Sequence, residues 1–427
     1  MKKGNLHPLL FAFFSFLLLF HLMLFWHAKD NALKGSADFS IFYTAAKMIQ
    51  RGQGAQLYDI AAQGRLESVL YPKVTARGGT LIYDHPPFEA LLFLPLAFIS
   101  YSAAYITWLV VNIILLLLIV RALLPYMTEI KAAWAPLPLL LFLSSFPVFV
   151  ALLQAQDSIL LLLVFTLVFL KLKKGDEFRG GIFLAIALFK FQYAVPFLAL
   201  FILWRRWKFI GGFVVSSVVL FVVSLPVAGF RGTLSYATFL SNLLRGVSSH
   251  RVQYSLGFLP NTVPNIRGAV EMLAPSVLPQ IFQKSIIVLL SGLAVLWVAR
   301  HWPLGRTPSG TAFDLGFSLA LVMSILVSYH TLLHDLSLLL IPFILVLNGT
   351  LKNEIFTGRR RLLIFALIAL FYLSPLYLLL MRHGLMYLFF WPILLFLVTL
   401  SRELILHANS SPQPGYENVA GPIANAT

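Results

Sequence analysis

Residues 102–123 read SAAYITWLVVNIILLLLIVRAL, and this stretch decides the fold class of the chain. Its apolar residues are continuous over 113–120, whereas a membrane β-strand would alternate apolar and polar residues. A helix needs about 20 mostly apolar residues to cross the hydrocarbon core of a bilayer. The stretch is therefore predicted to be a transmembrane helix.

Similar apolar segments account for the composition of the whole chain. Of its 427 residues, 59% are hydrophobic and only 11% are charged, whereas an average soluble domain carries about 25% charged residues. The pattern predicts an all-α polytopic membrane protein with about 12 crossings. Residues 1–400 form its single domain, and the polar residues 401–427 are predicted to be a disordered cytoplasmic tail. The other apolar segments fall at about 8–26, 86–99, 134–152, 158–172, 180–204, 209–228, 281–299, 313–330, 335–350, 361–380 and 384–400.

The surplus of basic residues also fits a membrane protein. Lys and Arg number 32 against 16 Asp and Glu, which gives a formal net charge of +16. In a soluble protein this charge would suggest nucleic acid, but here short basic loops beside anionic lipid are the better interpretation, so no nucleic-acid partner is expected. The chain has no cysteine, which excludes disulfides, thiolate metal sites and cysteine nucleophiles.

Three basic clusters orient the segments, because positively charged loops stay in the cytoplasm. Both termini are then inside, while residues 27–85, about 229–280 and 381–384 lie outside. Segment 180–204 allows two schemes: a hairpin with Lys190 at its outer tip, which we favour, or a single crossing. The clusters are Lys171, Lys173, Lys174 and Arg179; Arg205, Arg206 and Lys208; and Lys352, Arg359, Arg360 and Arg361.

The first outer loop, 27–85, is predicted to carry two interfacial amphipathic helices. One starts near Phe39 and ends at Gly52, and the other covers about 56–70. Asp38 directly precedes the first helix. It is either the N-cap of that helix or a general base that takes a proton from an alcohol.

Other ionisable residues next to apolar segments are informative, because a charge at a helix centre costs roughly 2.5–3.5 kcal/mol on insertion scales. Lys190 either extends to the membrane interface or provides a counter-charge to a phosphate. Asp84 and His85 either belong to a stiff Pro-Pro turn or face a cavity. Gln156, with Gln154 and Asp157, either forms a capped loop or binds a polar ligand.

His330 and His334 are spaced i and i+4, so they share a face if the helix continues, and Asp335 follows them. They could pack at a helix end, hold a metal, or contact phosphate or sugar; no H-E-x-x-H motif accompanies them. Arg382 and His383 lie in a tight outer loop and are either solvated or a second phosphate contact. The chain has no G-x-x-x-x-G-K-[ST], G-x-G-x-x-G or D-x-D motif, so nucleotide chemistry and a metal of the D-x-D type are not expected.

Several of these pieces together resemble the polyprenol-phosphate-mannose-dependent mannosyltransferase-like proteins, glycosyltransferase family 87. The resemblance covers about residues 35–345. Its motifs are Asp38-Phe39-x-x-Phe42-Tyr43-x-Ala45-Ala46 with Gly52 and Tyr58; Tyr83-x-x-Pro86-Pro87-Phe88 with Pro95-Leu96-Ala97; Trp108 and Asn112; Gln156; Leu188-Phe189-Lys190 with Trp204-Arg205-Arg206; and His330-x-x-x-His334-Asp335.

The resemblance implies a GT-C-type membrane fold and a sugar donor carried on polyprenyl phosphate. Asp38 would deprotonate the acceptor hydroxyl, on a lipid or glycan of the cell envelope, at the extracytoplasmic side of the plasma membrane. The transferred sugar would be a hexose, with mannose as one candidate, and no metal or other cofactor would be needed. The residues expected to bind the donor phosphate and the substrates are Lys190, His330, His334, Arg382, Tyr43, His85, Gln156 and Asp335.

Two other classes stay open. A lipid-linked oligosaccharide polymerase or ligase would use arginines of a late outer loop, and 229–280 offers Arg231, Arg245, Arg251 and Arg267. A transporter or flippase would need intramembrane charges along a pathway and often two related halves, and neither is evident in the sequence.

Overall fold

The computed structural model describes residues 6–72, 74, 81–245, 259–274, 278–302 and 310–410. Within these ranges the chain forms helices and turns and no strand, as the sequence predicts. The α-helices are α1 (Leu6–Asn31), α2 (Phe39–Gln50), α3 (Ile60–Leu70), α4 (Pro87–Phe93), α5 (Tyr101–Leu123), α6 (Thr128–Ala133), α7 (Leu137–Leu143), α8 (Phe146–Leu153), α9 (Ser158–Lys173), α10 (Glu177–Ile186), α11 (Phe191–Leu203), α12 (Trp207–Arg245), α13 (Ile266–Leu273), α14 (Gln280–His301), α15 (Thr311–Val327), α16 (Leu340–Leu351), α17 (Gly358–Leu370), α18 (Ser374–Arg382) and α19 (Phe390–Ser410).

Seven helical segments in the described part of the chain are long and apolar enough to cross a membrane, and the pair α17 and α18, bent by 61°, could form an eighth. The predicted number of about 12 crossings is not confirmed. Several predicted spans form shorter helices because proline interrupts them. Segment 134–152, for example, divides into α7 and α8 before Pro147.

Segment 177–203 is one of the seven by length and composition, but it folds back on itself. The backbone of Phe209 in α12 lies so close to Gly181 of α10 that a Cβ there would clash with it, and the ring of Phe209 stacks on Phe201 of α11 with centroids 3.7 Å apart. In a straight helix Gly181 and Phe201 would be about 30 Å apart. The chain therefore turns between α10 and α11, in the 3-10 helix η6 (Ala187–Lys190), as the hairpin scheme predicts.

The hairpin and its neighbours run between two chemically different ends of the bundle. Helix α9 starts at Ser158, beside Lys190, and ends at Lys173. Its 16 residues rise about 24 Å, less than the roughly 30 Å of a hydrocarbon core. The end at Ser158 and Lys190 is called the site end below, and the end at Lys173 is called the basic end.

All three predicted basic clusters gather at the basic end. Lys173 donates to Asp314 at 2.5 Å, which fixes the first cluster to the start of α15. Thr311, in the same turn, donates to Glu354 of the third cluster's loop. Arg206 of the second cluster pairs with Glu177, four residues beyond Lys173. One end of the bundle therefore carries the positive charge that the positive-inside rule assigns to the cytoplasm.

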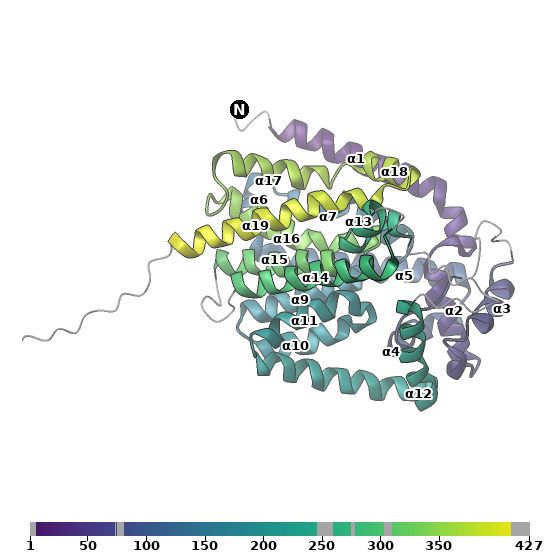
Figure 1. Cartoon of the computed structure of the whole chain (residues 1–427). Helices are drawn as coiled ribbons and strands as arrows, with labels where there is room; N and C mark the ends of the chain where they lie inside the picture. Colours follow the sequence, from purple (N-terminus) through teal and green to yellow (C-terminus); the bar gives the residue numbers. More distant parts are fainter. Residues whose placement is uncertain are drawn as a thin grey trace, which may run out of the picture.

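The described residues of 32–85, most of the predicted first outer loop, fold together with α4 as a cap over the site end (Figure 1), where α2, α3 and α4 lie together. Both predicted helices of the loop are present as α2 and α3. However, α2 is not a surface helix, because Phe39, Phe42 and Met48 are completely buried and Phe42 stacks on Phe93 of α4. The cap therefore has an apolar core of its own, which holds the N-terminus of α2 in a fixed position.

Helix α12 connects the cap to the bundle. It bends at Gly229, whose φ of 67° is left-handed, and its C-terminal part packs on the cap next to α4. The predicted outer loop 229–280 thus begins as helix, and its later residues include α13. Of the predicted disordered tail, residues 401–410 continue α19, and 411–427 lie outside the described residues.

Candidate active site

Asp38 stands at the beginning of α2 with its backbone already helical, and its side chain makes no cap hydrogen bond. The loop between α8 and α9 caps the helix instead. The side-chain carbonyl of Gln154 accepts from the Asp38 N–H at 2.9 Å, and its backbone carbonyl accepts from the Phe39 N–H at 3.0 Å. The N-cap interpretation of Asp38 is therefore wrong, because its side chain binds no N–H group of the first turn, and the Ser40 and Ile41 N–H groups donate to the Ala37 and Asp38 carbonyls.

The half-buried carboxylate of Asp38 is bound by the same loop. Gln156 Nε2 donates to Asp38 Oδ2 at 2.9 Å. The loop is rigidly placed, since Ala155 adopts a left-handed φ of 47° and the buried Asn112 of α5 donates to the Gln156 carbonyl at 3.0 Å. Two residues of one loop thus hold Asp38, one by its backbone and one by its carboxylate.

Lys190 lies at the buried centre of a charge network. Its Nζ is 2.7 Å from Asp157 Oδ1 and 2.6 Å from Asp335 Oδ1, and it donates to Ser158 Oγ at 2.8 Å. Three acceptors therefore surround the ammonium group: Ser158 and Asp335 accept hydrogen bonds from it, and Asp157 forms an ion pair with it. The charge of Lys190 is thus matched by two carboxylates, which gives no support to the predicted direct contact with a donor phosphate.

His334 and Asp335 belong to the same network. Ser158 Oγ lies 2.8 Å from His334 Nδ1 and donates to Asp335 Oδ1 at 2.8 Å. Asp335 Oδ2 accepts from the Leu332 N–H at 3.2 Å, which caps the 3-10 helix η8 (Leu333–Leu339). Asp335 therefore compensates the charge of Lys190 and stabilises the chain around it.

His330 does not share a helix face with His334, because α15 ends at Val327 and η8 starts at Leu333. The helix does not continue from His330 to His334, so the condition for a shared face is not met. His330 Nε2 lies 3.2 Å from Gln192 Nε2, and burial lowers the pKa of His330 to about 3. A neutral imidazole can hydrogen-bond to a ligand but adds no positive charge.

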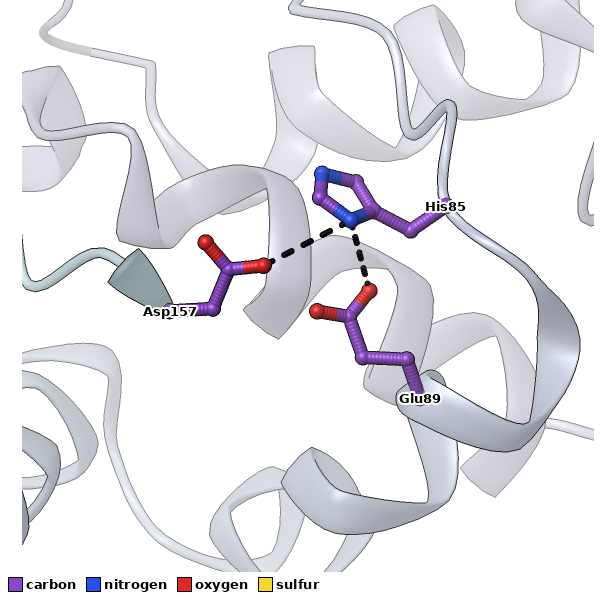
Figure 2. Close-up of side chains that lie close together, drawn as sticks. All are labelled: His85, Glu89 and Asp157. Atoms are coloured by element: carbon purple, nitrogen blue, oxygen red, sulfur yellow. Dashed lines mark ion pairs between the residues drawn. The ribbon is translucent and has the colours of Figure 1, made fainter. Parts of the chain in front are cut away.

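His85 extends the network toward the cap (Figure 2). Its Nδ1 lies 2.9 Å from Glu89 Oε2 and 3.6 Å from Asp157 Oδ2, and its Nε2 lies 3.4 Å from Asp84 Oδ1. Burial alone would lower the pKa of His85, but Glu89, Asp84 and Asp157 outweigh it and raise the pKa to about 10. The alternative in which Asp84 and His85 form only a stiff turn is therefore incomplete, because His85 reaches a carboxylate of the α8–α9 loop.

Two predicted site residues lie apart from this cluster. The hydroxyl of Tyr43 donates to the Ile99 carbonyl at 2.7 Å, so Tyr43 stabilises the cap. Arg382 is exposed at the end of α18, and no hydrogen bond or ion pair in the described part of the chain joins it to the cluster. These two residues therefore have no contact that supports a binding role.

The sequence reasoning missed Glu89 and Ser158. Glu89 follows His85 by four residues, with Pro86 and Pro87 between them. This spacing alone does not predict a contact, because the two side chains meet only through the proline turn. Ser158 has no distinctive pattern in the sequence, although its hydroxyl bridges Lys190, His334 and Asp335. The site thus combines a half-buried carboxylate, Asp38, with a buried network of opposite charges.

Comparisons with known proteins identify a family. The model of glycosyltransferase family 87 matches residues 83–328, a range that includes His85, Asp157 and Lys190 and begins after Asp38. No curated protein and no solved structure matches the chain. Because the match covers more than half of the 427 residues, the chain belongs to glycosyltransferase family 87.

Proposed function

We propose that this glycosyltransferase moves a hexose from a polyprenyl-phosphate sugar to a hydroxyl group of a lipid or glycan of the cell envelope. The acceptor oxygen bonds to the anomeric carbon as the bond from that carbon to the phosphate oxygen breaks. The acceptor proton passes to Asp38, and the electron pair of the broken bond stays on the lipid phosphate. Mannose is one candidate for the hexose.

One observation carries the role of Asp38. Its carboxylate is not used as a helix cap, is partly exposed, and is oriented by the Gln156 amide at 2.9 Å. A general base must be held in position and must also be open to its substrate. Other acidic residues of the cap have structural partners: Asp59 caps α3, and Glu67 accepts from the Leu81 N–H.

The arrangement of the two ends supports an extracytoplasmic site. The basic clusters mark the cytoplasmic end, and the network around Lys190 lies at the other end of α9. Because α9 rises only about 24 Å, the network would lie within the outer leaflet region rather than above it. A lipid-linked donor could then present its phosphate at the depth of the site.

The leaving phosphate needs a positive group, since stabilisation of developing charge is a large part of transferase catalysis. Lys190 is held between two carboxylates, so we assign this contact to Arg267, whose Nε donates to the single carboxylate of Glu271 at 3.1 Å. Arg267 belongs to α13, lies over the Tyr329 ring at 4.5 Å, and so reaches the segment that carries His330. A guanidinium group suits phosphate because it offers several N–H donors in one plane.

The proposal can be tested with purified protein in proteoliposomes. A panel of polyprenyl-phosphate hexoses labelled in the sugar is offered together with an envelope lipid extract. We expect labelled acceptor and free polyprenyl phosphate to form in equal amounts with one of the donors. Labelled donor that crosses the bilayer without transfer would instead support a flippase, and growth of a repeating glycan on the donor lipid would support a polymerase or ligase.

A further inference from the structure

The buried side chains of Glu89 and Asp157 and the partly buried side chain of His85 converge on one point (Figure 2). One ligand atom each from His85, Glu89 and Asp157 lies within 4.8 Å of the others. Glu89 is 2% exposed and Asp157 is not exposed at all. Glu89 Oε1 makes no hydrogen bond with any residue that the structure describes, although a buried polar atom is normally satisfied.

The balance of charge at this point is negative. Asp84, Glu89, Asp157 and Asp335 contribute four carboxyl groups, whereas Lys190 and the protonated His85 contribute two positive charges. Two carboxylates that face each other in a buried site need a proton or a cation between them. A divalent ion would offset more of this charge than a proton on His85 can.

The residues behind the three ligand atoms are arranged as outer partners of a metal site. Asp84 Oδ1 lies 3.4 Å from His85 Nε2, so a carboxylate orients the ring nitrogen that faces away from the centre. Lys190 Nζ forms an ion pair with Asp157 Oδ1 at 2.7 Å, and the other carboxylate oxygen, Asp157 Oδ2, is directed toward His85. The Tyr83 hydroxyl lies 3.4 Å from Glu89 Oε2, which leaves Glu89 Oε1 for a further partner.

We propose that His85, Glu89 and Asp157 bind a divalent metal ion of the Mn²⁺ type. In an octahedron with bonds of about 2.1 Å, neighbouring ligand atoms are about 3.0 Å apart and opposite ones about 4.2 Å. His85 Nδ1 lies 2.9 Å from Glu89 Oε2, close to the spacing of neighbouring ligands, and 3.6 Å from Asp157 Oδ2, which is between the two spacings. One imidazole and two carboxylates are a mixed nitrogen and oxygen set, which suits a divalent ion of the first transition series.

The three protein ligands leave positions open for a substrate oxygen. This part of the inference rests on the proposed function: the ion would bind an oxygen of the lipid phosphate and stabilise the charge that grows there as the sugar leaves. The site is close to the proposed base because Gln156, which holds Asp38, and Asp157, which binds the ion, are neighbours in the chain. The sequence alone predicts no metal, since it has no D-x-D motif.

The test uses the full chain in detergent or nanodiscs, first treated with EDTA and then titrated with Mn²⁺ while free Mn²⁺ is followed by electron paramagnetic resonance. We expect one tightly bound Mn²⁺ per chain, competition by Zn²⁺ or Mg²⁺, and a rise in thermal stability on binding. Glu89→Gln should weaken the binding at least about 10-fold. The matched control is Asp59→Asn, an exposed residue of the same cap whose helix-capping role asparagine keeps.

Absence of bound Mn²⁺ at millimolar concentration in folded wild-type protein would overturn the inference and leave a proton as the occupant of the site. Equal Mn²⁺ binding by wild type and Glu89→Gln would overturn it as well. If Glu89→Gln does not fold, Asp157→Asn and His85→Gln test the same three ligands. Mn²⁺ binding is measured without any sugar donor, so the two proposals can fail separately. Mn²⁺ binding without sugar transfer would reject the proposed function alone. EDTA-resistant transfer without Mn²⁺ binding would reject the metal site alone.

Discussion

The side-chain amide of Gln156 donates to the carboxylate of Asp38 at 2.9 Å, across 118 residues of chain. The next residue, Asp157, lies 2.7 Å from Lys190 at the centre of the buried network. One peptide bond therefore links the residue that orients the proposed base to the charged core of the bundle. The catalytic geometry depends on this loop as much as on Asp38 itself.

Replacement of Gln156 by alanine should slow transfer without weakening donor binding. The carboxylate would lose the side-chain donor that holds it among the described residues and would no longer be kept in one orientation. Misplacement of a catalytic group by about 1 Å can cost about 100-fold in rate, so we expect a fall in kcat of about 10- to 100-fold with an unchanged donor KM. Steady-state kinetics on a fixed acceptor measures both values.

Gln53→Ala, at an exposed position of the cap, is the control for Gln156→Ala and should leave kcat unchanged. Thermal stability in detergent separates orientation from folding. A Gln156→Ala protein with wild-type kcat would show that Asp38 does not need this hydrogen bond.

Lys190→Met should act mainly on stability. It leaves Asp157 and Asp335 buried without their counter-charge, and removal of one partner from a buried ion pair typically costs about 3–5 kcal/mol. We expect a clear drop in the unfolding temperature and loss of folded protein. Addition of Asp335→Asn should recover part of the loss, because the two changes are coupled.

Lys174→Met, at the exposed basic end, is the matched control and should unfold at the wild-type temperature. Lys190→Met protein that is as stable as wild type but binds donor more weakly would restore Lys190 to the phosphate contact predicted from the sequence.

Arg267→Gln should raise the donor KM. A charge-assisted hydrogen bond is worth about 1.5–3 kcal/mol, which corresponds to roughly a 10- to 150-fold change in kcat/KM. Arg231→Gln removes an equal charge from an exposed position of α12 and should leave the donor KM unchanged. Equal effects of the two variants would point to general attraction of an anionic lipid instead of a specific phosphate contact.

The orientation can be tested with single cysteines, since the chain contains none. Ser68→Cys lies on the exposed side of α3 in the cap, and Lys174→Cys lies at the basic end. We expect an impermeant thiol reagent added to intact cells to label position 68 and to label position 174 only after permeabilisation. The reverse pattern would place the site in the cytoplasm.

The sequence predicts the elements of this protein better than their path through the membrane. Apolar runs identify the helices, and the basic residues correctly group at one end of the bundle. The number of crossings could not be obtained from the sequence. Segment 177–203 has the length and composition of a spanning helix such as α5, but it forms the two arms of a hairpin, α10 and α11. Only packing distinguishes a hairpin from a single crossing. Here, Phe201 of α11 and Gly181 of α10 both contact Phe209 of α12.

The candidate site shows the same limit. Residue chemistry identified Asp38, His85, Gln156 and Lys190 as informative, and the structure brings them into one region. Their roles could not be read from the sequence, because partners lie far apart in the chain: Lys190 pairs with Asp335, 145 residues away. A lysine that looks available for phosphate in the sequence is in fact neutralised by carboxylates that only the fold supplies.

The most direct test of Asp38 as the base is single-turnover transfer by Asp38→Asn with saturating donor and acceptor. Asparagine keeps the size of the side chain and an oxygen that can accept from Gln156, but it cannot take the acceptor proton. We expect the rate to fall about 10²–10⁴-fold while donor binding and unfolding temperature stay at wild-type values. An Asp38→Asn protein that transfers sugar at nearly the wild-type rate would contradict the assignment of Asp38 as the base.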